Sequence, residues 1–351
     1  MLTCSWAPTV FAGNQTTDKR SRPTTLPTGG DMQQLQKQII ERYEALGLSH
    51  LLIAQRWWGD GNAIEGSSMD CLAMTAWYAA ISQSLHLITA IHPGFFQPSA
   101  IAKWGASISN LTGGRWSINV TSGWNMAEFE MYGIDPLDHS ARYQRSAEFV
   151  EVLRGAWANT HFSYEGQFYQ TQALQLEPRP TGALTVFQGG QSDAAIQLAT
   201  QHSDWMFLNG GHPERVKHLI EKVRNREAPK GRKLKFALYA APLCRPTDSE
   251  AWAEIDNRLS RLDHNLVEQR KVMLGATQAP GTDGAKGMWQ DSGDPLSHLD
   301  SNEGYCSRLI GSPETVWENI QQWQALGIDM LHLDLRDELF CAEVLPQVHK
   351  L

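Results

Sequence analysis

Strand-like and helix-like segments alternate along the whole of this 351-residue sequence. Short apolar segments predict eight buried strands, which are Leu2–Ala7, Leu51–Trp57, Leu85–His92, Arg115–Trp124, Leu184–Gly190, Trp205–Asn209, Leu234–Cys244 and Met330–Arg336. Apolar residues at helical spacing follow most of them, most clearly over Pro98–Asn110, Ser140–Trp157, Asp193–His202, Pro213–Arg226 and Ser312–Leu326. Because strands that alternate with helices form a parallel sheet, eight such units predict an α/β fold, a (β/α)8 TIM barrel.

Two segments interrupt the alternation. Asn14–Gly30 is rich in Thr, Pro and Gly, and Gly275–Glu303 combines Pro, Gly, Asp and Ser with little periodicity. Long segments of this kind in a compact domain are usually lids or binding loops, so we expect both to lie over the active site. A simple solvated excursion is the alternative for each. We therefore predict a single barrel domain over residues 1–351 with a lid insertion at about 275–303.

Charge and cysteine content narrow the class of function. The formal net charge is −8 and Lys and Arg do not cluster, which argues against a nucleic-acid partner. No apolar run approaches the roughly 20 residues of a membrane span. The five cysteines are scattered and form no CxxC pair, so we expect neither disulfides nor a metal site. No basic region precedes the apolar first residues, and we therefore expect a cytoplasmic protein that acts on a small molecule.

Polar side chains alternate with apolar ones along the expected strand Arg115–Trp124. Because successive side chains of a strand point to opposite faces, Ile118 and its apolar neighbours would face the helices. Asn119 and Thr121 would then point into the barrel near its C-terminal end, where barrel enzymes bind their ligands. The alternative is that Asn119 only satisfies backbone groups.

The last expected strand shows the same alternation, with His332, Asp334 and Arg336 on the face opposite to three leucines. Three ionisable side chains inside a barrel are costly unless they pair or meet a ligand. We therefore expect His332 and Arg336 to bind an anionic substrate or to manage protons, with a purely stabilising network as the alternative. His92 ends the third expected strand and joins these candidates, although a single histidine is more often structural.

The segment Phe187–Asp193 passes from a strand through a glycine turn into a helix. Glycines allow the backbone to approach an oxyanion, and the free N–H groups of a helix N-terminus favour a phosphate. Ser192 is placed to cap the helix and to donate to such a phosphate. The segment therefore predicts a barrel phosphate site, with an ordinary glycine turn before a capped helix as the alternative.

The stretch Asn110–Trp124 resembles the Gly-Gly-Arg-containing strand of luciferase-like flavin monooxygenases. Asp138–Phe149 is similar to their next helix, Phe187–Asp193 to their FMN-phosphate loop, and Leu326–Asp329 to the segment before their last strand. The similarity covers most of the chain from about Leu48 onward. It implies contacts of the flavin ring system with the following residues: Asn119, Glu128 and either Arg56 or Trp57.

The same resemblance implies where the flavin tail would lie. Arg142 and Tyr143 would line the ribityl-phosphate tail, and Gly190, Gln191 and Ser192 would hold the phosphate. Within the family, the chain is most similar to the alkanesulfonate, dimethylsulfone and pyrimidine monooxygenases. This implies reduced FMN from a separate NAD(P)H-dependent flavin reductase, O2 as co-substrate and a homo-oligomer. The implied reaction oxygenates a small organosulfur compound through a flavin (hydro)peroxide.

Several departures from the family pattern leave the substrate open. Ala90 stands where pyrimidine monooxygenases have a threonine, and His92 stands where alkanesulfonate enzymes have an arginine. The tail after Asp329 is about five residues shorter than in the sulfonate enzymes and lacks their Tyr-x-His pair. The alternatives are amide or other carbon oxidation as in pyrimidine monooxygenases, hydride transfer with a deazaflavin, and a non-catalytic flavin-binding barrel.

Overall fold

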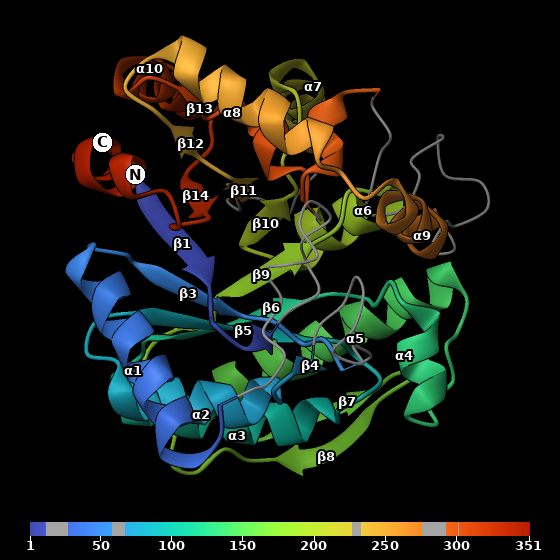
Figure 1. Cartoon of the computed structure of the whole chain (residues 1–351). Helices are drawn as coiled ribbons and strands as arrows, with labels where there is room; N and C mark the ends of the chain where they lie inside the picture. The colour runs from blue at the N-terminus through green and yellow to red at the C-terminus, as the bar shows by residue number, and fades with distance from the viewer. Residues whose placement is uncertain (12–26, 58–66, 227–232, 276–292, 301) are drawn as a thin grey trace.

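A computed structural model describes residues 1–11, 27–57, 67–226, 233–275, 293–300 and 302–351 (Figure 1). Eight parallel strands close into a barrel in the order β1-β14-β11-β10-β9-β6-β5-β3. Their bounds are β1 Leu2–Trp6, β3 His50–Ile53, β5 His86–Ile91, β6 Trp116–Val120, β9 Val186–Gly189, β10 Trp205–Leu208, β11 Lys235–Ala240 and β14 Met330–Leu333. The predicted TIM barrel is therefore confirmed, and each expected strand corresponds to one strand of the barrel.

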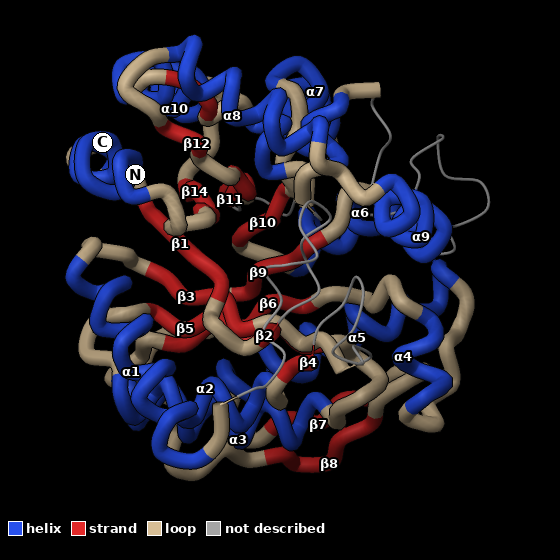
Figure 2. Tube along the Cα trace, in the orientation of Figure 1, coloured by secondary structure: helices blue, strands red, loops and turns tan. Residues whose placement is uncertain are grey.

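Helices surround the barrel on its outer face, blue around red in Figure 2. The five expected helices are present as α3 Pro98–Thr112, α5 His139–Ala158, α6 Asp193–His202, α7 Pro213–Arg224 and α10 Pro313–Ala325. The others in the described chain are α1 Gly29–Ala45, α2 Cys71–Ile81, α4 Met126–Met131, α8 Asp248–Ser260, α9 His264–Gly275 and α11 Leu345–Val348. There are also two short 3-10 helices, η2 Pro295–His298 and η3 Gly304–Ser307, and a π-helix, η4 Phe340–Val344. Three small two-stranded sheets pair β2 Val10–Phe11 with β4 Ser67–Ser68, β7 Phe162–Glu165 with β8 Gln170–Leu174, and β12 Leu243–Cys244 with β13 Ile310–Gly311.

The two expected long loops fall mostly outside the described residues. At the end of the first, Gly29 and Gly30 already belong to the first turn of α1, so the loop stops before Gly29. Part of the second forms η2, and its last residue, Glu303, is the N-cap of η3. The lid at about 275–303 and the single-domain organisation stay predictions.

Local sequence explains where several helices begin. The side chains of Asp70, Asp138, Ser192 and Ser312 each accept a hydrogen bond from the backbone N–H three residues later. These short polar side chains satisfy amide groups that have no partner inside the helix. The caps therefore fix where α2, α5, α6 and α10 begin.

One hydrophobic cluster lies between the barrel strands and the surrounding helices, and another lies inside the barrel. The expected outward face of β6 is confirmed, because the ring of Trp116 packs 5.7 Å from that of Trp104 in α3 and 5.6 Å from that of Trp157 in α5. Inside the barrel, Phe187 stacks on Trp205 with ring centroids 5.3 Å apart. Large side chains thus fill part of the interior in packed layers, which leaves ligands to the C-terminal end.

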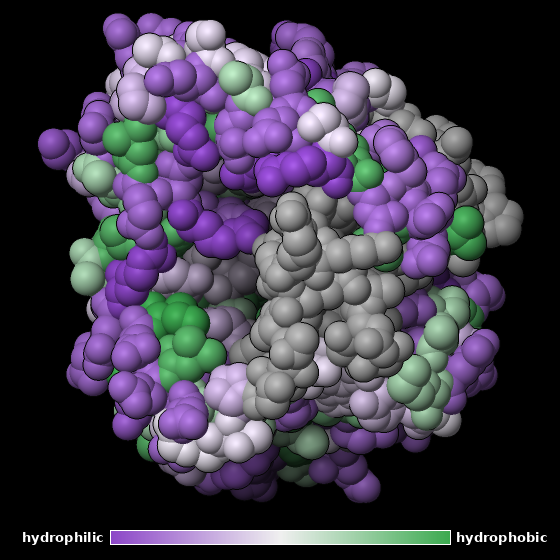
Figure 3. Space-filling model, in the orientation of Figure 1, coloured by the Kyte–Doolittle hydropathy of each residue, from purple (hydrophilic) through white to green (hydrophobic). Residues whose placement is uncertain are grey.

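The described residues on the face shown in Figure 3 are mostly hydrophilic, with hydrophobic side chains in small separate groups. None of the helices in the described part of the chain is long and apolar enough to span a membrane. The five cysteines are free and buried.

Candidate active site

A cavity opens at the C-terminal ends of the barrel strands, where this fold places its active sites. Every barrel strand, or a residue one or two positions after it, contributes to the wall: Trp6 (β1), Gln55 (β3), His92 (β5), Asn119 (β6), Gly189 (β9), Phe207 (β10), Tyr239 (β11) and His332 (β14). Helix α5 adds His139, Arg142 and Tyr143, and Asn302 lines the cavity from the segment before η3.

The structure brings most of the sequence candidates together at this cavity. Its wall contains seven residues expected to hold a flavin, which are Arg56, Asn119, Arg142, Tyr143, Gly190, Gln191 and Ser192. It also contains His92 and His332 from the catalytic candidates. Trp57, Glu128 and Arg336 are not part of the wall among the described residues.

One end of the cavity is built by the β9–α6 loop and the start of α5. Gly190 has a φ of 117°, and a Cβ there would come within 3.1 Å of the Tyr143 hydroxyl. Ser192 accepts a hydrogen bond from the Ala195 N–H at 3.2 Å and lies 3.5 Å from the Tyr143 hydroxyl. A glycine turn that leads into a helix N-terminus leaves backbone N–H groups free for an anion.

Arg142 adds positive charge to this end. One guanidinium nitrogen donates to the Leu137 carbonyl at 2.8 Å, whereas its buried Nε has no hydrogen-bond partner among the described residues. Burial lowers the pKa of Arg142 and raises the pKa of Tyr143. His139 stands beside Tyr143 with ring centroids 4.8 Å apart, and its pKa is lowered by burial and by Arg142. This end of the cavity is therefore suited to a phosphate.

Further buried polar atoms of the cavity wall lack hydrogen-bond partners within the described parts of the chain: Gln55 Nε2, Asn119 Oδ1, Thr121 Oγ1 and His332 Nε2. Buried polar groups in folded proteins are nearly always hydrogen-bonded, because an unmade bond costs about 1–3 kcal/mol. Several such atoms in one cavity indicate a polar ligand. The described residues contain no group of three or more His, Cys, Asp or Glu side chains that would hold a metal ion.

The expectation that Glu128 touches the flavin needs correction. Helix α4 turns the Glu128 side chain beneath the cavity wall, where it has no solvent exposure. Its Oε2 lies 3.2 Å from His92 Nδ1, and its Oε1 accepts a hydrogen bond from the Trp57 N–H at 3.0 Å. Glu128 therefore acts on the cavity through His92.

Trp57 likewise lies behind the wall rather than in it. Its indole packs against the rings of Phe95, Phe96 and Tyr132, at centroid distances of 5.4, 5.6 and 5.2 Å. Of the two residues expected to flank the flavin ring, Arg56 is the one that lines the cavity.

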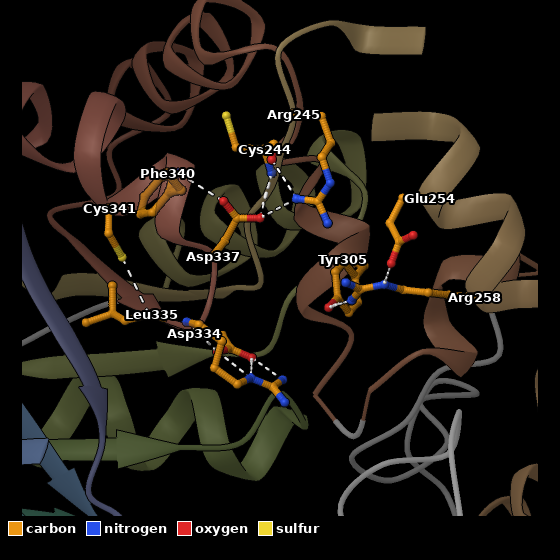
Figure 4. Close-up of polar contacts among 11 residues, drawn as sticks. Cys244, Arg245, Glu254, Arg258, Tyr305, Asp334, Leu335, Asp337, Phe340 and Cys341 are labelled. Atoms are coloured by element: carbon orange, nitrogen blue, oxygen red, sulfur yellow. Dashed lines mark hydrogen bonds and ion pairs between the residues drawn. The ribbon is translucent and has the colours of Figure 1, made fainter. Parts of the chain in front are cut away.

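The expected interior row His332, Asp334, Arg336 is wrong beyond its first member. Strand β14 ends at Leu333, so the alternation of faces stops there. Arg336 donates from Nε to both oxygens of Asp334 at 2.8 Å, and its side chain is 66% exposed. Figure 4 shows Asp334 on this turn, apart from the pair of Arg245 with Asp337. Only His332, which is 2% exposed, faces the cavity.

Sequence reasoning missed several wall residues: Trp6, Gln55, His139, Phe207, Tyr239 and Asn302. Alternation along the first strand would have found Trp6, which shares the interior face with Cys4. The same alternation would have found Phe207 between Met206 and Leu208. No pattern marks Asn302.

Comparisons with known proteins agree with this geometry. A family model described as luciferase-like monooxygenase matches residues 16–330. An FMNH(2)-dependent dimethylsulfone monooxygenase of Pseudomonas fluorescens (strain Pf0-1) is 33% identical over 324 residues, covering 90% of this chain and 87% of that protein. One of Pseudomonas putida is 34% identical over 283 residues, covering 78% and 76%.

Among solved structures, DmoA from Hyphomicrobium sulfonivorans has the same fold, with a TM-score of 0.76 at 17% identity over 100% of this chain and 88% of that chain. Because the family model and the two sequence relatives each span most of the chain, the chain belongs to the luciferase-like monooxygenase family.

Proposed function

We propose that the protein is the oxygenase of a two-component system that uses FMNH2 and O2 to oxygenate a small organosulfur compound. The relatives that support this proposal are named FMNH(2)-dependent dimethylsulfone monooxygenases. The observation that carries it is a single cavity that combines a phosphate-like cradle with several unpartnered buried polar atoms. A separate flavin reductase would supply the reduced cofactor. A homo-oligomer and a cytoplasmic location stay predictions.

The residues present fit the phosphate tail of FMN. Gly190 and the N-terminus of α6 would offer backbone N–H groups, and Ser192 and Tyr143 would offer hydroxyl groups. Arg142 would supply positive charge from α5. A Cβ at position 190 would fill the cradle, which explains the glycine there.

The other end of the wall fits a flat heterocycle with donors and acceptors along its edge. Asn119 lies on β6, and Thr121 follows that strand directly. Gln55 follows β3, which β5 separates from β6. Each of the three has a buried polar atom without a partner in the described chain. Reduced flavin, when bound, supplies the electrons that activate O2, a chemistry that no side chain provides. The protein has to hold it, exclude water and place a proton carrier beside it.

His92 and Glu128 are suited to carry the proton. The Glu128 carboxylate, held by the Trp57 N–H, faces His92 Nδ1 and favours a proton on that nitrogen. Nε2 is then left as an acceptor on a residue of the cavity wall. The Gln55 side chain accepts a hydrogen bond from the His92 N–H at 2.8 Å and holds the backbone at this point. The aromatic packing around Trp57 closes the wall behind this pair.

The test is O2 consumption by the purified protein with FMN, NADH and a flavin reductase. Sulfones, alkanesulfonates and cyclic amides are offered in turn, and product is measured beside O2. We expect product only when reductase, FMN and an organosulfur compound are all present. Product from none of the organosulfur compounds, or turnover with a deazaflavin but not with FMN, would contradict the proposal.

A further inference from the structure

Three aromatic side chains surround His332 on one side of the barrel. We call Trp6, Phe207, Tyr239 and His332 the aromatic chamber. Their ring centroids lie 4.5 Å (Trp6), 5.6 Å (Phe207) and 5.3 Å (Tyr239) from that of His332. All four residues line the cavity, and they come from β1, β10, β11 and β14, which are consecutive staves.

The aromatic chamber lies across the barrel from Asn119. In the closed order of eight strands, β14 and β6 are four strands apart in either direction. The phosphate-like end, built from the β9–α6 loop and α5, is therefore not formed by β14 and its two neighbours. A flavin held by Asn119 and Ser192 would leave the aromatic chamber for the second reactant.

The imidazole at the centre of the chamber is uncharged. His332 is 2% exposed, and burial lowers its pKa to about 3. The charged group that acts on it is the carboxylate of Asp334, which opposes this shift in pKa. Its Nε2 has no hydrogen-bond partner among the residues that the structure describes.

The cations that sequence reasoning or the cavity wall offers are paired or belong to other parts of the wall. Arg336 is bound to Asp334 through Nε, and both charges act on Tyr239 with opposite sign, so the pair brings little net charge to the chamber. Arg142 belongs to the phosphate-like end, and Arg56 follows β3, which is separated from β14 by β1. The three rings around His332 carry no charge.

We propose that the aromatic chamber selects an uncharged substrate, with His332 as the specificity-determining residue that donates a hydrogen bond from Nε2 to a sulfone-type oxygen. The anion of the corresponding sulfonate is rejected, which replaces the anionic substrate expected from the sequence. This inference rests on the proposed function. It adds to that function the charge class of the substrate and the residue that recognises the substrate.

Dimethyl sulfone and methanesulfonate form a matched pair of probes. Both carry a tetrahedral sulfonyl group, and they differ by one methyl group against one negatively charged oxygen. Burial of an anion without a cationic partner is strongly unfavourable, whereas a sulfone oxygen needs only one donor. The methyl groups of the sulfone would pack against the aromatic rings.

The experiment measures binding of each probe to the FMN-loaded protein by ligand-observed NMR, together with steady-state kinetics in the reductase system. In the parent we expect dimethyl sulfone to bind at least roughly tenfold more tightly than methanesulfonate. His332→Phe keeps the volume and removes the donor, so affinity for the sulfone should fall roughly five- to tenfold. His332→Gln keeps a donor and should retain most of the affinity for the sulfone. Arg336→Met should bind both probes as the parent does.

Equal or tighter binding of methanesulfonate, or an unchanged sulfone affinity in His332→Phe, would overturn the inference. Flavin binding is followed on the same preparations by quenching of FMN fluorescence. A parent that binds no flavin refutes the proposed function, whereas normal flavin binding with the wrong probe preference refutes only the role of the chamber. The comparison of the two probes needs no variant, so a misfolded His332→Phe leaves the test intact.

Discussion

His92 Nδ1 lies 3.2 Å from the Oε2 of Glu128, a carboxylate with no solvent exposure. The other oxygen of Glu128 accepts the Trp57 N–H at 3.0 Å. A buried carboxylate is costly unless it is paired or hydrogen-bonded, and these two contacts compensate the burial of Glu128. They tie the orientation of one cavity-wall imidazole to the short helix α4.

From this contact we expect Glu128→Gln to lower kcat by roughly tenfold to a hundredfold, because His92 loses the negative charge that lies 3.2 Å from its Nδ1. His92→Ala should lower it further, and the double variant should be no worse than His92→Ala alone. Glu130→Gln, an exposed position on the same helix, is the control and should not differ from the parent. Additive losses in the double variant would show that Glu128 acts independently of His92.

Ser192 has two roles that substitutions can separate. Ser192→Ala removes the N-cap of α6, which should cost about 1 kcal/mol of stability, and a hydroxyl near the phosphate, which should weaken FMN binding by roughly 1–2 kcal/mol. Ser192→Asp keeps a cap, so stability should survive while binding falls further through like-charge repulsion. Ser312→Ala removes the equivalent cap of α10 and should lower only the melting temperature. Unchanged FMN binding in both Ser192 variants would place the phosphate elsewhere.

Gly190→Ala tests the cradle itself. A Cβ at this φ of 117° would lie 3.0 Å from the Ala195 Cβ and 3.1 Å from the Tyr143 hydroxyl. We expect a stability loss of about 1–2 kcal/mol and FMN affinity reduced by roughly tenfold. Gly113→Ala has a φ of 66° with nothing within 4 Å of the new Cβ, so it should show strain without any change in FMN binding. Equal FMN affinity in the two variants would argue against a phosphate at Gly190.

Two arginine variants compare an exposed ion pair with a buried one. Arg336→Met should cost less than about 1 kcal/mol, because the Arg336 side chain is 66% exposed. Arg215→Met should cost roughly 2–4 kcal/mol, because its partner Glu303 has a side chain only 2% exposed. Urea unfolding measures both. A larger loss in Arg336→Met than in Arg215→Met would contradict the assignment of Arg336 to an exposed turn.

Histidines at the N-terminal end of the barrel predict sensitivity to acid. Burial lowers the pKa of His50 to about 3 and that of His86 to about 4. Histidine in an unfolded chain has a pKa of about 6.5, so below that pH these two side chains bind protons in the unfolded chain but not in the folded protein. The free energy of unfolding should therefore fall as the pH drops from about 6.5 towards 4. His50→Gln should reduce this slope by up to about 1.4 kcal/mol per pH unit, as urea unfolding at several pH values would measure. Identical slopes in variant and parent would contradict the prediction.

The barrel was predictable because each buried parallel strand needs an apolar run of its own, and eight such runs are visible. The ends of the strands were not. The pattern His-Leu-Asp-Leu-Arg continues past Leu333, yet Asp334 accepts a hydrogen bond from the Arg336 N–H at 3.1 Å and turns the chain. A side chain that bonds its own neighbouring backbone leaves no trace in hydrophobic periodicity.

The position of Glu128 was hidden for a similar reason. The number of residues between Asn119 and Glu128 does not predict the direction in which the six-residue helix α4 points the Glu128 side chain. The contact with His92 joins residues 36 positions apart, and only the packed structure reveals it. Wall residues on regular strands were accessible to reasoning from alternation, whereas Asn302, placed by a hydrogen bond between its carbonyl and the Gly210 N–H, was not.

The pairing of β1 with β14 cannot form until the end of translation, which affects how the nascent chain folds. Cys4 pairs with His332, and the Met1 amino group donates to the Val348 carbonyl at 3.0 Å. During translation, one edge of β1 has to wait without its partner until more than 300 further residues have been made. Exposed strand edges promote aggregation, so this nascent chain would depend on chaperones or on rapid docking of its early helices. A chain that stalls before residue 330 is left with an open sheet and with three of the four residues of the aromatic chamber, because His332 has not yet been made.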